Sequence, residues 1–293
     1  MAAGSEMRLE FTKPPRRVVS LVPSMTESLF DLGLGEALVG ATDFCIHPAD
    51  QIKAVPRVGG TKDPRITDLL ALQPDLVIAN QEENSQETVA ALKAAGIKVW
   101  LTFPKSVRGM LDALWILVGI FRSEDAAVRL QTLEMGVEWA RAASESLPHF
   151  RYFCPIWQDQ LGGTDWWMTF NQDTYASDLL SLFGGENVFA MRRRRYPLAS
   201  EFGIADEEPV GERDTRYPRV TAEEIRASAP DLILLPDEPF VFGEEHRQQF
   251  LETWKDLPAG KNQQIYCVDG TWIAWYGTRI GKAIEGLSQI LQH

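Results

Sequence analysis

A repeated helix and strand pattern constrains the fold of this chain most strongly. Residues 59–84, GGTKDPRITDLLALQPDLVIANQEEN, combine a Gly-Gly turn, a short helical pattern, a Pro-Asp corner and an apolar strand. Residues 221–239, TAEEIRASAPDLILLPDEP, repeat the helix, the corner and the strand, so that Pro230 follows Pro74 by 156 residues. Gly33 and Gly184, which each end a predicted helix, lie 151 residues apart. Both spacings predict two related lobes.

The order of strands and helices predicts an α/β protein with a parallel sheet in each lobe. Strands at 18–22, 38–42, 76–79 and 97–102 alternate with short helices, which is typical of right-handed crossovers. Further strands are predicted at 151–157, 166–170 and 265–269, and helices at 175–183, 246–254 and from Arg279. Helical periodicity over 106–121 and 123–147 predicts two helices, the second long enough to connect the lobes.

We therefore expect an N-terminal lobe at 16–122, a connecting helix at 123–147 and a C-terminal lobe at 148–293. Residues 190–215 are irregular and charged, and we interpret them as an insertion loop. Ser24 or Thr26 is the expected N-cap of the first helix. Because ligands bind at the carboxyl ends of strands in open α/β sheets, we expect a ligand cleft between the lobes.

Composition excludes several classes of partner. The net charge of −12 argues against nucleic acid and against an anionic membrane surface. Three scattered cysteines imply no disulfide framework and fit a reducing compartment. Residues 1–17 contain no signal-peptide core, and the apolar run 110–121 is too short to span a bilayer. We expect a cytoplasmic protein as the sequence stands, or an extracytoplasmic one if the sequence is a mature or truncated form.

The predicted strand ends carry many aromatic and polar residues. The segments expected at the cleft are 23–26, 43–47, 59–62 and 80–84 in the first lobe, and Trp157, Trp166, Trp167, Tyr217, 237–240 and 272–276 in the second. Aromatic faces suit a large, flat or partly apolar ligand. The alternative for Trp166 and Trp167 is that they alternate in a strand, with one of them in the core.

Two loop segments bear on metal and acid–base chemistry. Cys45 and His47 form a candidate metal pair with Glu82 or Glu83, or else a buried thiol and a turn histidine before a proline. A closed site needs four ligands and no second Cys/His pair exists, so no protein-built metal site is expected. His47 as a single axial ligand to a metal held in a cofactor remains a hypothesis.

Glu82 and Glu83 suit general acid–base catalysis, helix capping or hydrogen bonding to a ligand. We favour the last two, because the sequence has no nucleophile elbow, phosphate-binding glycine loop or dinucleotide fingerprint. An enzyme that uses Glu82, Glu83 and His47 is the less favoured alternative. Arg192–Arg195 either meet an anionic ligand group or form a solvated run balanced by the nearby acidic residues 206–208.

A set of motifs carries a family resemblance across residues 16–290. VVSLVPSMTESLFDLGLGEALVG, VGGTKDP, LLALQPDLVIA, LLSLFGGENVF and YPRVTAEEI occur in that order. This order resembles the helical-backbone metal receptor family, the class III substrate-binding proteins of ABC importers for cobalamin, ferric siderophores and haem. The cobalamin-binding branch is the most similar. The resemblance implies two lobes, a rigid connecting helix, no enzymatic activity and no built-in cofactor, with cobalamin or an iron chelate as the ligand.

The resemblance also implies particular site residues. Together with the analysis above, it makes the expected ligand-binding set Pro23, Ser24, Phe44, His47, Gly60, Thr61, Asn80, Glu83, Asn84, Trp157, Trp166, Trp167, Tyr217, Trp272 and Trp275. Family members dock on their permease through a surface glutamate on each lobe. Glu223 is the candidate on the second lobe, and Glu87, next to Gln86, is the candidate on the first. We expect a monomer that meets a metal chelate and an ABC permease. A cytoplasmic carrier or sensor without a permease is the alternative.

Overall fold

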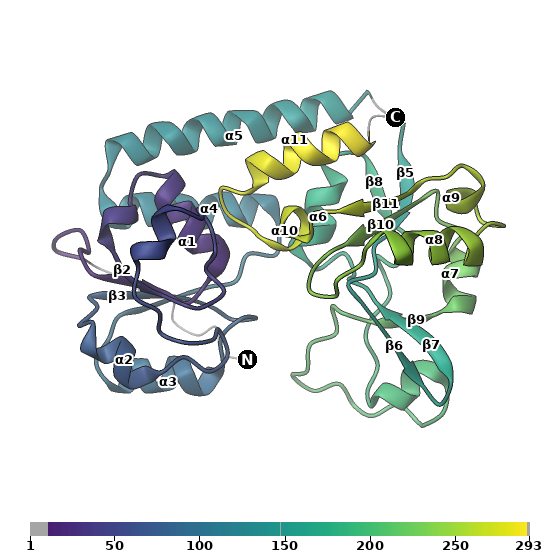
Figure 1. Cartoon of the computed structure of the whole chain (residues 1–293), viewed down its shortest axis with the longest axis horizontal. Helices are drawn as coiled ribbons and strands as arrows, with labels where there is room; N and C mark the ends of the chain where they lie inside the picture. Colours follow the sequence, from purple (N-terminus) through teal and green to yellow (C-terminus); the bar gives the residue numbers. More distant parts are fainter. Residues whose placement is uncertain (1–10, 147, 292–293) are drawn as a thin grey trace. The chain divides into compact units, whose positions relative to one another are not determined.

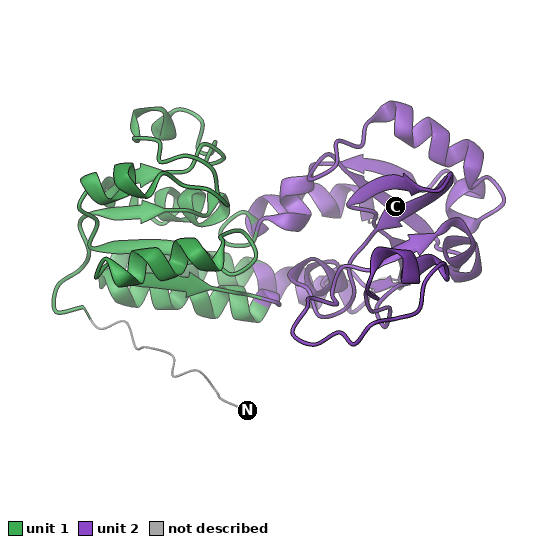
Figure 2. Ribbon diagram, turned by 90° about the horizontal axis from the view of Figure 1, so that it is seen from below, with its two compact units in different colours: residues 1–104, 108–136, 276–279 green, residues 105–107, 137–275, 280–293 purple. Residues whose placement is uncertain are grey.

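The computed structural model describes residues 11–146 and 148–291, which belong to two compact units (Figures 1 and 2). Unit 1 comprises residues 1–104, 108–136 and 276–279, and unit 2 comprises residues 105–107, 137–275 and 280–293. Residues 1–10, on which most of the expectation about a signal peptide depends, lie outside the described residues.

Unit 1 contains a four-stranded parallel sheet in the order β2-β1-β3-β4. Its apolar residues, among them Val19, Leu21 and Val77, pack with Leu69 and Leu92 of the covering helices. The strands are β1 (Val18–Ser20), β2 (Leu38–Ala41), β3 (Leu76–Asn80) and β4 (Val99–Thr102). The helices are α1 (Pro23–Asp31), α2 (Ile66–Ala71), α3 (Gln86–Ala94) and most of α4 (Val107–Phe121), with 3-10 turns η1 (Gly35–Ala37) and η2 (Gln51–Ala54).

Unit 2 contains a second four-stranded parallel sheet, in the order β11-β10-β5-β8. The strands are β5 (Phe150–Phe153), β8 (Gly185–Asn187), β10 (Leu232–Pro236) and β11 (Ile265–Val268). The helices are α6 (Tyr175–Ser181), α7 (Ala222–Ser228), α8 (Glu244–Thr253), α9 (Pro258–Lys261), α10 (Gly270–Ala274) and α11 (Ile280–Leu291). When strands are counted along the chain, each sheet has the order second, first, third, fourth. The predicted relation between the lobes is thus present in their topology.

The two Pro-Asp corners make the same hydrogen bonds in each unit. Asp75 accepts from the amide of Arg17 at 3.1 Å, and its own amide donates to the Arg17 carbonyl at 2.9 Å. Asp231 makes the matching pair with Arg151, at 3.0 and 2.8 Å. The residues two positions before these aspartates, Gln73 and Ala229, have left-handed backbones with φ of 47° and 44°. Each corner therefore links the start of the third strand to the start of the first.

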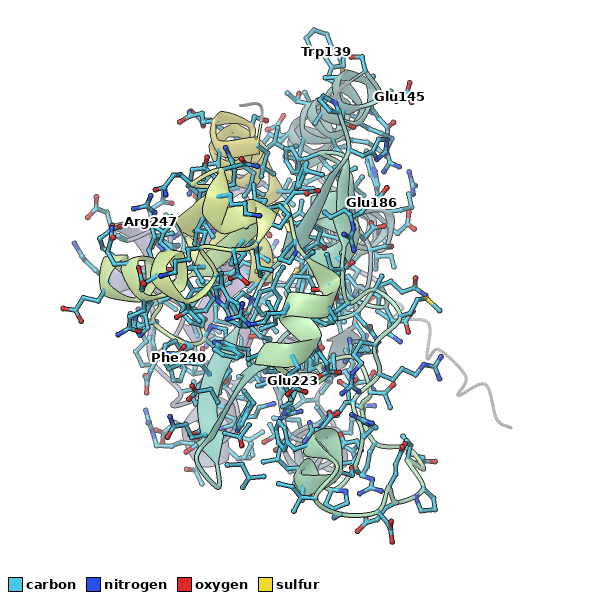
Figure 3. The ribbon with its side chains drawn as sticks, turned by 90° about the vertical axis from the view of Figure 1, so that its right-hand side faces the viewer. Trp139, Glu145, Glu186, Glu223, Phe240 and Arg247 are labelled. Atoms are coloured by element: carbon cyan, nitrogen blue, oxygen red, sulfur yellow. The ribbon has the colours of Figure 1, made fainter. Side chains whose placement is uncertain are left out.

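A long helix, α5 (Glu124–Ser144), begins in unit 1 and ends in unit 2. The Ser123 hydroxyl accepts a hydrogen bond from the Ala126 amide at 3.2 Å and so caps the start of this helix. Trp139 projects from this helix and is 77% exposed (Figure 3). Among the described residues, no helix has the length and apolar character needed to cross a membrane.

Unit 2 also contains an antiparallel sheet that the sequence analysis missed. It consists of β6 (Trp157–Leu161), β7 (Thr164–Met168) and β9 (Arg219–Thr221), in that order. Gly162 and Gly163 have φ of 59° and 81° and form the two-residue turn between β6 and β7, which is the backbone that a tight hairpin requires. The predicted strand 151–157 was therefore wrong, because it merged the end of β5 with the start of β6.

The expected N-cap of the first helix was also wrong. α1 begins at Pro23, and the N-cap position is Val22, whose side chain forms no capping hydrogen bond. Proline suits the first helical position because the amide that it lacks has no partner there. Thr26 lies inside the first turn and donates to the Val22 carbonyl at 3.0 Å. Gly33 follows the helix with φ of 75°, as its predicted role in ending the helix requires.

Candidate functional site

Two buried asparagines hold together the loops at the carboxyl end of the sheet in unit 1. The Asn80 side chain accepts from the amides of Glu82 and Glu83 at 2.7 and 3.2 Å and donates to the Thr102 carbonyl at 3.1 Å. The Asn84 side chain accepts from the Asn80 amide at 2.7 Å. It also donates to the carbonyls of Leu21 and Thr61, at 3.2 and 2.8 Å. Both asparagines therefore position loops and do not present free amides.

Tyr276 joins this network, although sequence reasoning assigned the segment 272–276 to the second lobe. Its hydroxyl lies 3.0 Å from the Thr102 hydroxyl. Burial, together with the negative charge of Glu83, raises the pKa of the Tyr276 phenol, so the group stays neutral. Residues 276–279 belong to unit 1, where Arg279 forms a buried two-bond ion pair with Glu27 at 2.6 and 2.8 Å.

Glu82 and Glu83 do not cap the following helix, so that expectation was wrong. The N-cap of α3 is Ser85, whose hydroxyl accepts from the Thr88 amide at 3.2 Å. The backbone amides of the two glutamates bind Asn80, and Lys62 donates to the Glu82 carbonyl. Both side chains are half-buried.

Unit 1 presents an exposed apolar surface after β2. Phe44 is 60% exposed and Ile46 is also exposed. A Cβ atom placed on Gly60 would lie 3.9 Å from the Phe44 ring, and the Asp43 amide donates to the Gly59 carbonyl at 2.8 Å. The structure thus brings Phe44 together with the Gly60-Thr61 turn. Pro23 and Ser24 are buried in the first turn of α1.

The contacts of Cys45 fit a buried thiol and not a metal ligand. Its sulfur lies 3.1 Å from the hydroxyls of both Thr26 and Thr42. Burial raises the pKa of the Cys45 thiol, which disfavours the thiolate that metals bind. His47 is half-buried and precedes a cis proline. The described part of the chain holds no group of three or more His, Cys, Asp or Glu side chains arranged to bind a metal ion.

Unit 2 presents its own aromatic surface, where β6 meets the loop after β10. Trp157 is 38% exposed, and its ring centroid lies 5.7 Å from that of Phe240 in an edge-to-face contact. The ring centroid of Phe240 (Figure 3) lies 4.6 Å from that of Phe242. Val241, in the same loop, is exposed. Phe44 and Phe240 each lie in a loop that follows the carboxyl end of a parallel strand, β2 and β10 respectively.

Trp166 and Trp167 are only 5% and 7% exposed, so neither offers a free aromatic face. They alternate in β7, as in the alternative interpretation, and both sides of the strand are covered at these positions. Trp167 packs in the core with Trp254 at 5.7 Å. Trp166 lies 6.4 Å from Phe202, which belongs to the insertion, and 5.9 Å from the Arg219 guanidinium. Phe202 of the insertion therefore packs against Trp166, whereas Trp167 lies in the core.

The remaining aromatic candidates are half-buried. Trp272 in α10 lies against Gly286 of α11, where a Cβ atom would collide with the indole ring. Trp275 follows α10, and its amide donates to the Thr271 carbonyl at 3.1 Å. The Tyr217 ring lies 5.3 Å from the Arg216 guanidinium.

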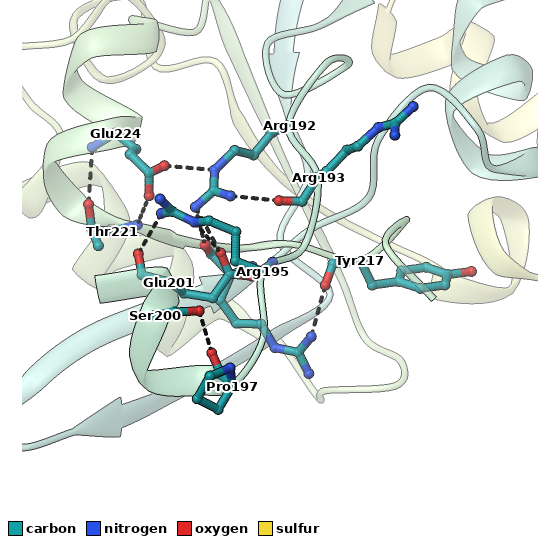
Figure 4. A network of polar contacts seen from close by, with 10 residues as sticks. Arg192, Arg193, Arg195, Pro197, Ser200, Glu201, Tyr217, Thr221 and Glu224 are labelled. Atoms are coloured by element: carbon teal, nitrogen blue, oxygen red, sulfur yellow. Dashed lines mark hydrogen bonds and ion pairs between the residues drawn. The ribbon is translucent and has the colours of Figure 1, made fainter. Parts of the chain in front are cut away.

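The arginine run is paired with carboxylates that sequence reasoning did not select (Figure 4). Glu201 lies in a 3-10 turn (Leu198–Phe202) and is buried. It accepts from Arg192 at 2.9 Å and from Arg195 at 3.3 Å, while Arg192 also binds Glu224 at 2.9 Å. The expected balance by residues 206–208 was wrong, because Arg192 and Arg195 pair with Glu201, a buried carboxylate inside the insertion.

The two docking candidates do not occupy equivalent positions in the two units. Glu223 and Glu87 are exposed, each at the second position of its helix, α7 and α3 respectively. The repeat, however, makes α7 the counterpart of α2, because both helices precede the Pro-Asp corner. Thr67 is the residue of α2 that corresponds to Glu223. Within the repeat, the counterpart of Glu223 is therefore Thr67 and neither Gln86 nor Glu87.

Some of these features had signals in the sequence and others had none. Gly162-Gly163 between two strand patterns is a hairpin signal. The repeat itself aligns Glu223 with Thr67. The position of Tyr276 and the pairing of Glu201 depend on contacts between distant segments, which no local pattern records.

Comparison with known proteins agrees with this architecture. The chain is 24% identical over 288 residues to the vitamin B12-binding protein of Vibrio cholerae serotype O1, covering 95% of this chain and 90% of that protein. It is similar to the structure of periplasmic vitamin B12-binding protein BtuF of Vibrio cholerae, with TM-score 0.74, 22% identity and coverage of 95% and 97%. It is also similar to the periplasmic haem-binding protein RhuT from Roseiflexus sp. RS-1 in apo form, with TM-score 0.72, 23% identity and coverage of 94% and 98%.

The sequence matches the periplasmic binding protein family over residues 18–271. The match includes both parallel sheets, both Pro-Asp corners and the long helix α5. This chain therefore belongs to the periplasmic binding protein family.

Proposed function

We propose that this chain binds cobalamin or a related metal chelate, such as haem or a ferric siderophore, and delivers it to an ABC permease without chemical change. The observation that carries the proposal is the pair of exposed apolar surfaces at the carboxyl ends of parallel strands. Phe44 and Ile46 form one in unit 1, and Trp157, Phe240 and Val241 form the other in unit 2.

The chemistry of these surfaces fits a large chelate. Exposed aromatic side chains supply apolar contact area with few rotatable bonds, so little entropy is lost on binding. The Asn84 side chain donates to the carbonyl of Thr61, which follows the Gly60 that lies near Phe44. The Asn80 side chain accepts from the Glu82 amide in the loop after β3. These hydrogen bonds hold the loops in place, which lowers the ordering cost on binding.

Cobalamin is the first candidate among the chelates. The relative from Vibrio cholerae is a vitamin B12-binding protein and matches nearly the whole chain. Haem is the second candidate, because the structure of RhuT has a similar fold and belongs to a haem-binding protein. For either ligand, His47 is the proposed axial ligand to the metal. A His47→Ala variant whose cobalamin complex keeps the wild-type absorption spectrum would remove this role.

The exposed helix starts are the proposed contact with a permease. Glu223 lies at the second position of α7, beside a capping box formed by Thr221 and Glu224, so its helix start is rigid. Thr67 takes the corresponding place on α2. We propose that Glu223 contacts a basic group of the permease. Reversal of charge in Glu223→Lys would then weaken transport and leave binding of the chelate unchanged.

Titration of intrinsic tryptophan fluorescence with cyanocobalamin, haem and ferric siderophores tests the proposal. We expect saturable quenching by at least one of them, and roughly tenfold weaker binding in Trp157→Ala and in Phe44→Ala, since each removes a large contact area. Trp139→Ala is the matched control, because Trp139 is an exposed tryptophan of α5 outside both surfaces. Absence of saturable quenching with every ligand would contradict the proposal.

A further inference from the structure

The exposed Trp157 and the cationic Arg219 lie on the same face of the antiparallel sheet in unit 2. Trp157 of β6 pairs with Met168 of β7, and Met168 pairs with Arg219 of β9. Side chains directly opposite each other in antiparallel strands point to the same face. Adjacent strands are about 4.8 Å apart, so Arg219 lies roughly 10 Å from Trp157 along this row. The aromatic surface thus continues across Met168 to a guanidinium.

The carboxylates around this face are already engaged by other arginines. Glu201 and Glu224 bind Arg192, and Glu201 also binds Arg195 (Figure 4). The Glu201 oxygens accept, in addition, from the backbone amides of Arg195 and Arg219, at 3.0 and 3.2 Å. Little accepting capacity is left on this carboxylate.

Nearby acidic residues of the insertion are paired as well. Asp214 binds Arg216 with two hydrogen bonds, at 3.0 and 2.6 Å. Glu208 binds Arg213 at 3.1 Å. These pairs leave Arg194 and Arg219 as guanidinium groups that no carboxylate of the described residues approaches within 4.0 Å.

Arg219 is held in place with hydrogen-bonding capacity unused. One terminal nitrogen donates to the Tyr217 carbonyl at 2.9 Å, and the guanidinium lies 5.9 Å from the centre of the Trp166 ring. Its Nε atom is buried and has no hydrogen-bond partner within the described part of the chain. Burial and the positive charge of Arg194 lower the pKa of Arg219. The negative charge of Glu201 acts in the opposite direction, but Glu201 forms its ion pairs with Arg192 and Arg195 and not with the Arg219 guanidinium.

Arg194 is oriented by stacking. Its guanidinium lies 4.3 Å from the centre of the Tyr196 ring, and its amide donates to the Thr215 carbonyl at 2.9 Å. The Tyr196 hydroxyl donates to the Asp214 carbonyl at 2.7 Å, which fixes the ring. By contrast, Arg193 is exposed and points away from the network (Figure 4). The two oriented cations are Arg194 and Arg219.

We propose that Arg219 and Arg194 form an anion-binding subsite for an oxyanion of the bound chelate, either a phosphodiester or a carboxylate. This inference rests on the proposed function and names the chemical group that unit 2 recognises beside Trp157. Guanidinium groups bind planar oxyanions with paired hydrogen bonds. The anionic group of the ligand would then pair with these two guanidinium groups, which form no ion pair with a carboxylate of the described residues.

Matched ligand pairs and matched variants test the subsite. Cobalamin carries a phosphodiester that cobinamide lacks, and haem carries two carboxylates that its dimethyl ester lacks. We would measure the Kd of each by fluorescence quenching for wild-type protein, Arg219→Gln and Arg194→Gln. Arg213→Gln is the control, because Arg213 stacks on the same Tyr196 ring at 4.2 Å but is already paired with Glu208.

We expect Arg219→Gln and Arg194→Gln to weaken binding of the oxyanion-bearing ligand about 10- to 100-fold, as loss of a charge-assisted hydrogen bond predicts. Binding of the counterpart that lacks the oxyanion would change less than about twofold, and Arg213→Gln would match wild type. If wild type binds a chelate while the variants are unaffected, or lose both ligands of a pair equally, the subsite is wrong and the proposed function stands. If wild type binds no chelate, the proposed function fails. Should Arg219→Gln not fold, Arg194→Gln alone decides the matter.

Discussion

At the scale of single residues, buried polar groups determine how the loops of unit 1 are held. Asn80, Asn84 and Tyr276 each satisfy backbone or hydroxyl groups of segments that are distant in sequence. Arg279 does the same for α1 through Glu27. None of these partners follows from a local pattern, because each depends on how the sheet brings distant segments together. Sequence analysis predicted that the asparagines bind a ligand. In the structure their side chains form hydrogen bonds with backbone groups of neighbouring loops and strands.

The Glu27–Arg279 pair predicts a large and specific loss of stability. Arg279→Ala leaves a buried carboxylate without its partner and should lower the free energy of unfolding by about 3–5 kcal/mol. Arg108→Ala is the control, because Arg108 forms exposed pairs with Asp112 and Glu134, and it should cost less than about 1 kcal/mol. Urea unfolding followed by circular dichroism measures both. Equal, small effects of the two substitutions would show that the buried pair does not stabilise unit 1.

The three cysteines should differ sharply in reactivity. Burial raises the thiol pKa of all three cysteines, but Cys45 and Cys154 are buried whereas Cys267 is exposed to a reagent. At pH 8 the thiolate, which is the reactive form, is therefore scarce at the two buried positions. We expect iodoacetamide to modify Cys267 first, and to modify the other two only after denaturation. Mass spectrometry of the peptides gives the order, and early labelling of Cys45 would contradict its position in the core.

At the scale of elements, the parallel strands were predictable and the antiparallel sheet was not. Apolar runs such as 76–80 and 232–236 are buried along their full length, which gives a strong local signal. Strand β9 is three residues long and is defined only by its pairing with β7. The insertion likewise looked solvated, because its four consecutive arginines have a block of acidic residues, 206–208, nearby in the sequence. In the structure, the buried carboxylate of Glu201 forms ion pairs with Arg192 and Arg195.

That network predicts that the conformation of the insertion depends on one carboxylate. Glu201→Gln removes the charge that binds Arg192 and Arg195 while keeping the size of the side chain. We expect the variant to lose stability by about 2–4 kcal/mol and trypsin to cleave faster at the arginines of 192–195. Glu208→Gln, at an exposed position in the same insertion, is the control and should behave as wild type. Unchanged cleavage of Glu201→Gln would mean that packing of Phe202 on Trp166 suffices.

At the scale of the whole molecule, the chain uses one α/β unit twice. The shared strand order and the matching hydrogen bonds of the two Pro-Asp corners establish this relation. The repeat was visible in the sequence because each corner needs Pro and Asp before a buried strand. The position of Tyr276 in unit 1 was not visible, because the chain returns to that unit for only four residues, 276–279. Within the repeat, Glu223 corresponds to Thr67 and not to Glu87.

The central claim is that this member of the periplasmic binding protein family holds a metal chelate on exposed aromatic surfaces. Isothermal titration of the full chain with cyanocobalamin, and then with haem, measures this directly. We predict saturable binding of one chelate per chain with a Kd of about 1 μM or tighter, and a negative heat-capacity change from burial of apolar surface. Titrations without binding heat at any temperature, for both ligands and for ferric siderophores, would contradict the account.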